Sequence, residues 1–136
     1  MWGFCYINNM FTISQNEFQD IINVSIQSLP KAYIDRLENV AFIVEDYPTP
    51  AQRKQLELRN DQTLFGLYEG VPLSRRQGTT KLLPDKITIF KDPIEFVSNN
   101  LAELRTQVAK TVWHEVAHYY GLNHDQINAL NSKAKG

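Results

Sequence analysis

The chain is poor in cysteine, because Cys5 is the single one in 136 residues. One cysteine cannot form an internal disulfide, which excludes the small disulfide-stapled scaffolds of secreted proteins and favours a reducing compartment. The net charge is also small, at −1. A chain this close to neutral has no general attraction to nucleic acid or to anionic membranes. No apolar run approaches the length of a transmembrane helix, so we expect a cytoplasmic protein without membrane contact.

The first nine residues are apolar, but we do not expect them to form a signal peptide. They lack a positive n-region, a long h-region and a small-residue cleavage site. Patterned sequence begins just after Met10, so residues 1–9 are interpreted as an N-terminal extension. The chain is 43% hydrophobic and 21% charged, which is ordinary for a globular protein. Its length suits one domain with a single hydrophobic core.

Helical periodicity starts near the N-terminus. Ser14 followed by Glu17 has the form of a capping box, which predicts a helix over residues 15–29 that stops at Pro30. Residues 31–38 predict a short second helix. Both segments are expected to supply core residues rather than chemistry.

Three short runs predict β-strands. The β-branched run 40–44 predicts a buried strand, residues 63–69 a second strand, and the alternating run 86–90 a third. The charged segment 50–60 is ambiguous. Thr49 can cap a helical turn that begins with proline at the next residue, although a loop containing some helix is favoured.

Two helix-start signatures follow the third strand. Residues 92–95 provide a cap at Asp92, a proline in the first turn and an acidic residue at the third position. Asn100 and Glu103 repeat this signal before a last helix, predicted over residues 101–120.

This last helix is amphipathic at about 100° per residue. Its apolar arc predicts a core-facing side made of Leu101, Leu104, Val108, Val112 and Val116. His114 and His118 lie off this arc. They share a flank with Gln107 and Thr111, and Glu115 falls between the flank and the arc. The helix is therefore expected to pack on the sheet and to present this flank to a cleft.

All three histidines of the chain lie in residues 113–124, a window that reads H-E-x-x-H-x-x-G-x-x-H. His114 and His118 are four residues apart, so one helix face can present both imidazoles to one metal ion. Gly121 can take a positive φ and end the helix. That turn allows His124 to come back as a third ligand.

Three protein ligands leave a fourth position for water, which is typical of catalytic rather than structural zinc. Zn²⁺ lowers the pKa of such a water to roughly 7, and Glu115 can take its proton as general base. At ordinary residue frequencies the motif arises by chance on the order of once in 10⁵ chains of this length. The alternative is a set of surface histidines near a helix end.

The window resembles the signature of zinc metallopeptidases, and its extended form is similar to that of the metzincins. It departs from the metzincins because Met1 and Met10 both precede the motif, so we expect no Met-turn after it. The chain from about Phe18 onward more closely resembles a small bacterial family of zincin-like metallopeptidases. In that family the third ligand is often an acid, where this chain has His124. The segments that carry this resemblance are 29–30, 39–40, 44–46, 65–73, 83–90, Glu95 and 111–122.

The resemblance implies a minimal zincin-like α+β fold, with a single domain over residues 1–136. A small mixed sheet would pack against an N-terminal helix and a C-terminal active-site helix. After the motif, residues 126–130 predict a short helix, and residues 131–136 are expected to form a disordered tail. The resemblance also implies zinc-dependent hydrolysis of a peptide or protein substrate.

Three functions remain open from the sequence. The leading one is a zinc peptidase in which His114, His118 and His124 hold the metal. Glu115 would be its catalytic base, and the strand carrying Tyr68 could pair with an extended peptide, although Tyr68 itself is expected to pack on the core. The second is a non-catalytic zincin scaffold that binds metal or a protein partner. The third is a metal-dependent endoribonuclease with H-x3-H-x5-H spacing. Glu115 after the first histidine and the near-neutral charge, which provides no evident RNA groove, both make this alternative less favoured.

Overall fold

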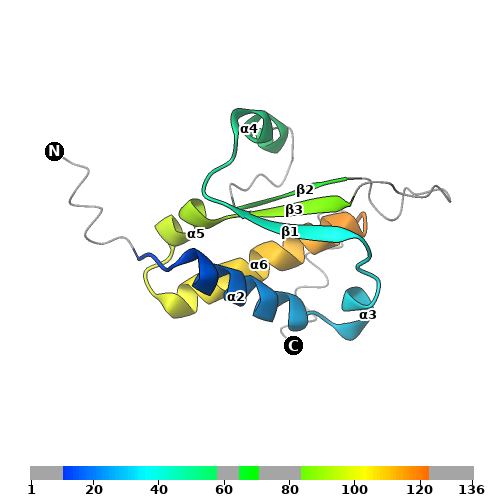
Figure 1. Ribbon diagram of the computed structural model, residues 1–136, viewed down its shortest axis with the longest axis horizontal. Coiled ribbons are helices and arrows are strands. Elements are labelled where there is room, and N and C mark those ends of the chain that lie inside the picture. Colours follow the sequence, from blue (N-terminus) through cyan, green and yellow to red (C-terminus); the bar gives the residue numbers. More distant parts are fainter. Residues whose placement is uncertain (1–10, 58–64, 71–83, 123–136) are drawn as a thin grey trace.

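The structure is a computed structural model that describes residues 11–57, 65–70 and 84–122 (Figure 1). The extension 1–9, His124, the expected helix 126–130 and the tail 131–136 lie outside these residues. No helix within the described ranges is long and apolar enough to cross a membrane. The elements follow one another in the order α2 (Gln15–Gln27), α3 (Lys31–Ile34), β1 (Val40–Glu45), α4 (Pro50–Glu57), β2 (Gly66–Glu69), β3 (Asp85–Phe90), α5 (Lys91–Val97) and α6 (Leu101–Tyr119).

The three strands form one mixed sheet in the order β1-β3-β2. β1 runs parallel to β3, from Val40 opposite Asp85, whereas β2 runs antiparallel to β3, from Gly66 opposite Ile89. The predicted mixed sheet is therefore confirmed. The prediction that β1 is buried was wrong, because every residue of this outer strand is half-buried. The central strand β3 is the buried one.

The helices α2 and α6 lie against one face of the sheet, and α4 lies over the other (Figure 1). Strand alternation divides the buried side chains between these layers. Leu67 and Phe90 form a small cluster on the α4 side. Each fully buried aliphatic or aromatic side chain stabilises the fold by about 1.5–3 kcal/mol. The main cluster joins α2, β3, α5 and α6 through Phe18, Ile22, Ile87, Ile89, Ile94, Leu104, Val108, Val112 and Val116.

Reciprocal caps fix the starts of α2 and α4. The Ser14 hydroxyl accepts from the Glu17 N–H at 3.1 Å, and the Ser14 N–H donates to the Glu17 carboxylate at 3.2 Å, as predicted. Thr49 and Gln52 make the same pair of bonds at 3.1 and 2.9 Å. Of the two alternatives for this charged segment, the structure has the helix, which begins at Pro50.

The starts of α5 and α6 differ in how well the sequence predicted them. The prediction of a cap at Asp92 was wrong, because α5 has Phe90 at its N-cap, without a side-chain cap bond. The chain passes from β3 directly into α5, and the Asp92 N–H donates instead to the backbone oxygen of Asp46 at 3.1 Å. The second prediction is confirmed, because the Asn100 side chain caps α6 by accepting from the Glu103 N–H at 2.9 Å.

Candidate metal and catalytic site

The two sides of α6 have different compositions and different burial. On the core side, Leu104, Val108, Val112 and Val116 are completely buried. Only Leu101, at the first turn, is half-buried. The flank is polar, and its exposure falls from the half-buried Gln107, His114 and His118 to the buried Thr111 and Glu115. The periodicity of the sequence therefore predicted the orientation of this helix.

His114 and His118 present their imidazoles side by side on this flank. Their ring centres are 4.8 Å apart, with the ring planes at 69°. Zinc–nitrogen bonds of about 2.0–2.1 Å at a tetrahedral angle would place two ring centres roughly 5 Å apart. The spacing of the pair therefore fits two imidazole ligands of one zinc ion, and imidazole nitrogen suits this metal.

The third expected ligand, His124, lies outside the described residues. Within the residues described, no group of three or more potential metal ligands is found. The three-histidine site thus stays a prediction. The structure shows that its first two histidines, His114 and His118, lie side by side.

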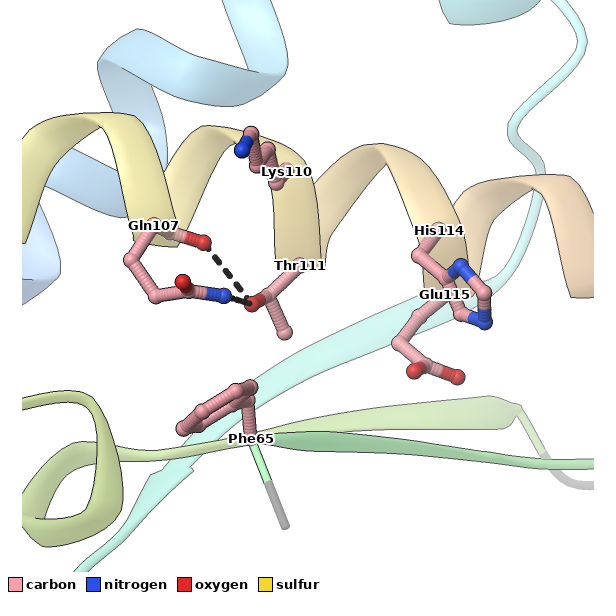
Figure 2. Close-up of a pocket in the computed structure, with 6 residues that line it drawn as sticks. All are labelled: Phe65, Gln107, Lys110, Thr111, His114 and Glu115. Atoms are coloured by element: carbon pink, nitrogen blue, oxygen red, sulfur yellow. Dashed lines mark hydrogen bonds between the residues drawn. The ribbon is translucent and has the colours of Figure 1, made fainter. Parts of the chain in front are cut away.

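Glu115 is completely buried and extends from α6 toward the sheet (Figure 2). It lies against Gly66 of β2, where an added Cβ would come within 3.1 Å of the Glu115 Cγ and 2.7 Å of the Thr111 Cγ2. Real Cβ atoms essentially never show a contact as short as the one with Thr111, and the one with Glu115 is also unusually tight. Glycine at this position thus allows β2 to pack directly on α6, and the strand and Thr111 together restrict where the Glu115 carboxylate can lie.

A cavity of about 120 Å³ opens beside His114 and Glu115, between α6 and the start of β2 (Figure 2). This volume holds several waters or one short side chain. The Gln107 amide donates to the Thr111 hydroxyl at 3.3 Å, and that hydroxyl donates to the Gln107 backbone oxygen at 2.8 Å. The cavity is lined by Phe65, Gln107, Lys110, Thr111, His114 and Glu115.

Phe65 and Lys110 were not expected in the site from the sequence. Lys110 precedes His114 by four residues, so helical spacing was a signal that could have placed it on the same flank. Phe65 carries no comparable local signal, because it reaches the site through the packing of β2 on α6.

The end of α6 has the geometry that the glycine in the motif predicts. Gly121 takes a φ of 79°, and its N–H donates to the His118 backbone oxygen at 2.9 Å. The Leu122 N–H donates to the Ala117 oxygen at 3.1 Å. These two bonds form a Schellman motif. The chain therefore leaves the helix axis just after the histidine pair.

Tyrosines on α6 and β2 hold this end of the helix in place. Tyr119 is completely buried, and its ring is edge-on to that of Tyr68, with centres 6.1 Å apart. The Tyr68 hydroxyl donates to the Asp85 carboxylate at 2.7 Å. Tyr68 therefore packs inward, as expected.

On the other side of the helix, Tyr33 packs edge-on against both Trp113 and Tyr120, each at 5.2 Å. The Tyr120 hydroxyl donates to the backbone oxygen of Tyr33. Burial, with Tyr119 adding to it, raises the pKa of the Tyr120 hydroxyl, so it stays a donor at neutral pH.

Comparison with known proteins agrees with this geometry. None of the curated proteins matches the chain. The model of a family described as zincin-like metallopeptidase matches residues 37–134, which is more than half of the chain. The matched segment includes the whole sheet, α6 and the complete histidine window. The resemblance to zincin-like metallopeptidases is thereby confirmed, and the chain belongs to the zincin-like metallopeptidase family.

Proposed function

We propose that this protein is a zinc-dependent peptidase, with Glu115 as its general base. His114, His118 and His124 would be the ligands of the metal. The observation that carries the proposal is the arrangement on α6, where two imidazoles 4.8 Å apart flank a completely buried carboxylate beside an open cavity. Family membership supports the same class of reaction.

Zinc, when bound, would supply a Lewis acid that polarises the peptide carbonyl and makes a water more acidic. The Glu115 carboxylate would accept a proton from the attacking water and then deliver it to the nitrogen of the departing amine. In this step a C–O bond forms, the C–N bond breaks and the proton passes through Glu115. The tight packing of Gly66 and Thr111 on its stem would keep the carboxylate oriented throughout.

The substrate of this proposal is a peptide or an unfolded segment of a protein. β2 is an outer strand of the sheet as described, and its first residue packs on Thr111 and Glu115. An extended peptide lying along the outer side of β2 would therefore pass close to the proposed base. A cytoplasmic location, expected from the single cysteine, is part of the same proposal.

The first test is zinc content, measured by elemental analysis on protein purified without chelators or an affinity tag. We expect about one zinc per chain in the parent protein and none in His118→Ala, because two protein ligands cannot retain the metal. A parent protein that stays metal-free after zinc has been supplied would refute the proposal.

The second test is peptide cleavage by the Glu115→Gln variant. We expect it to retain zinc and to lose roughly 10²–10⁴-fold in turnover, which is the usual contribution of a general base. A non-catalytic scaffold would show no turnover in either protein. An endoribonuclease would cleave RNA rather than peptides, so an RNA substrate serves as the control for that alternative.

A further inference from the structure

We infer that the cavity beside Glu115 binds an aliphatic side chain of the substrate, next to the bond that is cleaved, and that Phe65 limits the size of this side chain. This inference rests on the proposed peptidase function. It defines a class of substrate, namely peptides that carry valine, isoleucine or leucine at one position adjacent to the cleaved bond, in preference to alanine, aromatic residues and charged residues.

The position of the cavity places its occupant beside the reacting bond. Glu115, the proposed base, is one of the lining residues, and His114, the first proposed zinc ligand, is another. Successive residues of an extended peptide are about 3.3 Å apart, and their side chains point to alternate sides. When the cleaved bond lies at this base, the side chain that enters the cavity therefore belongs to a residue next to that bond.

The surface of the cavity is mostly apolar, although several of its residues are polar. The Thr111 hydroxyl donates its hydrogen to the Gln107 backbone oxygen at 2.8 Å and accepts from the Gln107 amide at 3.3 Å. It therefore has no hydrogen left for a ligand. Lys110 is exposed, and its ammonium points away from Phe65 (Figure 2). The surface offered to a ligand thus comes largely from the Phe65 ring and from carbon atoms of the flank.

The size of the cavity favours a branched aliphatic side chain. An apolar cavity of about 150 Å³ holds one benzene molecule. The cavity beside Glu115 measures about 120 Å³, so an aromatic ring is too large for it, whereas the side chains of valine, isoleucine and leucine fit. Phe65 lies across the cavity from Gln107 and Thr111 (Figure 2). The Phe65 ring is therefore the wall that sets the upper limit of size.

A charged side chain suits this cavity poorly. Glu115 is completely buried, so a second carboxylate would meet its negative charge in surroundings that exclude water. A cationic side chain would lose its own hydration in an apolar space. If it paired with Glu115, it would occupy the carboxylate that the proposed reaction requires. An aliphatic side chain has neither cost, and its transfer from water to an apolar wall is favourable.

The test uses a library of synthetic decapeptides that are randomised at the central positions, with two readouts. Mass spectrometry first identifies the bonds that the zinc-loaded parent cleaves, and then the peptides that the zinc-loaded Glu115→Gln variant retains. We expect valine, isoleucine and leucine at one position beside the cleaved bond to be enriched roughly tenfold or more over alanine, because each methylene missing from an apolar pocket costs about 10–200-fold. Phenylalanine, tyrosine and tryptophan should be depleted at the same position.

Phe65→Ala should shift this preference from aliphatic to aromatic side chains, because it removes the wall that limits the size. Gln107→Ala is a second variant that leaves the sheet untouched, since Gln107 is half-buried on α6. It widens the cavity on the opposite side, so it should also admit larger side chains. Phe42→Ala is the matched control, because Phe42 is half-buried on β1, at the other edge of the sheet as described. It should leave the preference unchanged.

The outcomes separate the cavity from the peptidase. Cleavage without an aliphatic preference beside the bond, or with an acidic or basic preference there, would overturn the inference and leave the peptidase intact. An aliphatic preference that neither Phe65→Ala nor Gln107→Ala changes would do the same. Retention of aliphatic peptides that depends on these two residues, without any cleavage, would support the cavity and refute the peptidase. Neither cleavage nor aliphatic retention would refute both.

Discussion

The two sides of α6 have different tasks, although their residues alternate along the same nineteen-residue helix. The core side is aliphatic and completely buried from Leu104 to Val116. The flank carries the imidazole pair, the cavity wall and Lys110. On the core side the type of residue matters through volume and apolar area, whereas on the flank it matters through hydrogen bonding and charge. Stability and chemistry can therefore be changed separately in this protein.

Glu115 is the place where the two sides meet. It is as completely buried as the valines of the core side, yet it lines the cavity on the flank. A buried carboxylate is expensive unless its surroundings satisfy it, so such a residue is rarely retained for packing alone. The helix thus carries its proposed base at the boundary, where β2 shields it from solvent and the cavity gives it access to a ligand.

The largest expected effect comes from truncating the core side. Leu104→Ala should lower the free energy of unfolding by roughly 2–5 kcal/mol, because it removes buried methyl groups and leaves a cavity. Zinc bound per folded chain should stay as in the parent. Chemical denaturation measures the first quantity and elemental analysis the second. Leu101→Ala is the matched control. Leu101 is half-buried, so this variant should lose clearly less unfolding free energy. A loss of zinc from folded Leu104→Ala would contradict the separation of the two sides.

The sequence predicted the elements whose signals are local. The caps at Ser14 and Asn100 lie within four residues of their partners, and the arc of α6 follows from helical periodicity alone. The histidine pair follows from the same periodicity. The end of α6 at Gly121 follows from the tolerance of glycine for positive φ.

The features that the sequence did not predict depend on contacts between distant segments. Asp92 has the right neighbours for a cap, but the pairing of β3 with β1 continues to Phe90 and starts the helix earlier. For the charged segment after Thr49 the sequence offered a cap by this residue but favoured a loop, and it gave no sign that Gln52, the partner in the cap, is buried. The cavity joins Phe65 to side chains more than forty residues away, and no local pattern encodes that distance.

A smaller effect is expected where β2 touches the flank. Gly66→Ala would place a Cβ 2.7 Å from the Thr111 Cγ2, so the Thr111 side chain, the strand or the helix must shift. We expect a loss of about 1–3 kcal/mol in unfolding free energy, as for other overpacked sites. Peptide cleavage per folded chain should also decrease, because the Glu115 stem lies in the same contact. This decrease should be larger than the fraction of unfolded protein explains. Denaturation and peptide cleavage, measured together, separate the two losses.

The double variant Gly66→Ala/Thr111→Ser provides the control for this contact. Serine lacks the Cγ2 methyl that the new Cβ would meet, so the second change should recover part of the lost stability. The two substitutions should therefore couple in a double-mutant cycle. Strictly additive losses would mean that the strand does not press on α6 at this point.

The smallest of the three effects concerns the point where the flank ends. Gly121 holds a φ of 79°, which lies in the left-handed region that a Cβ disfavours. Gly121→Ala should lower the unfolding free energy by about 1 kcal/mol, whereas Gly121→Asn should lower it less, because asparagine tolerates this conformation. Thermal denaturation of the three proteins tests this order. If the turn also delivers His124 to the metal, zinc affinity should decrease in the same order, with alanine weaker than asparagine and asparagine weaker than glycine. Equal zinc affinities across a confirmed order of stabilities would show that the turn serves the fold alone, and that the third ligand reaches the flank independently of it.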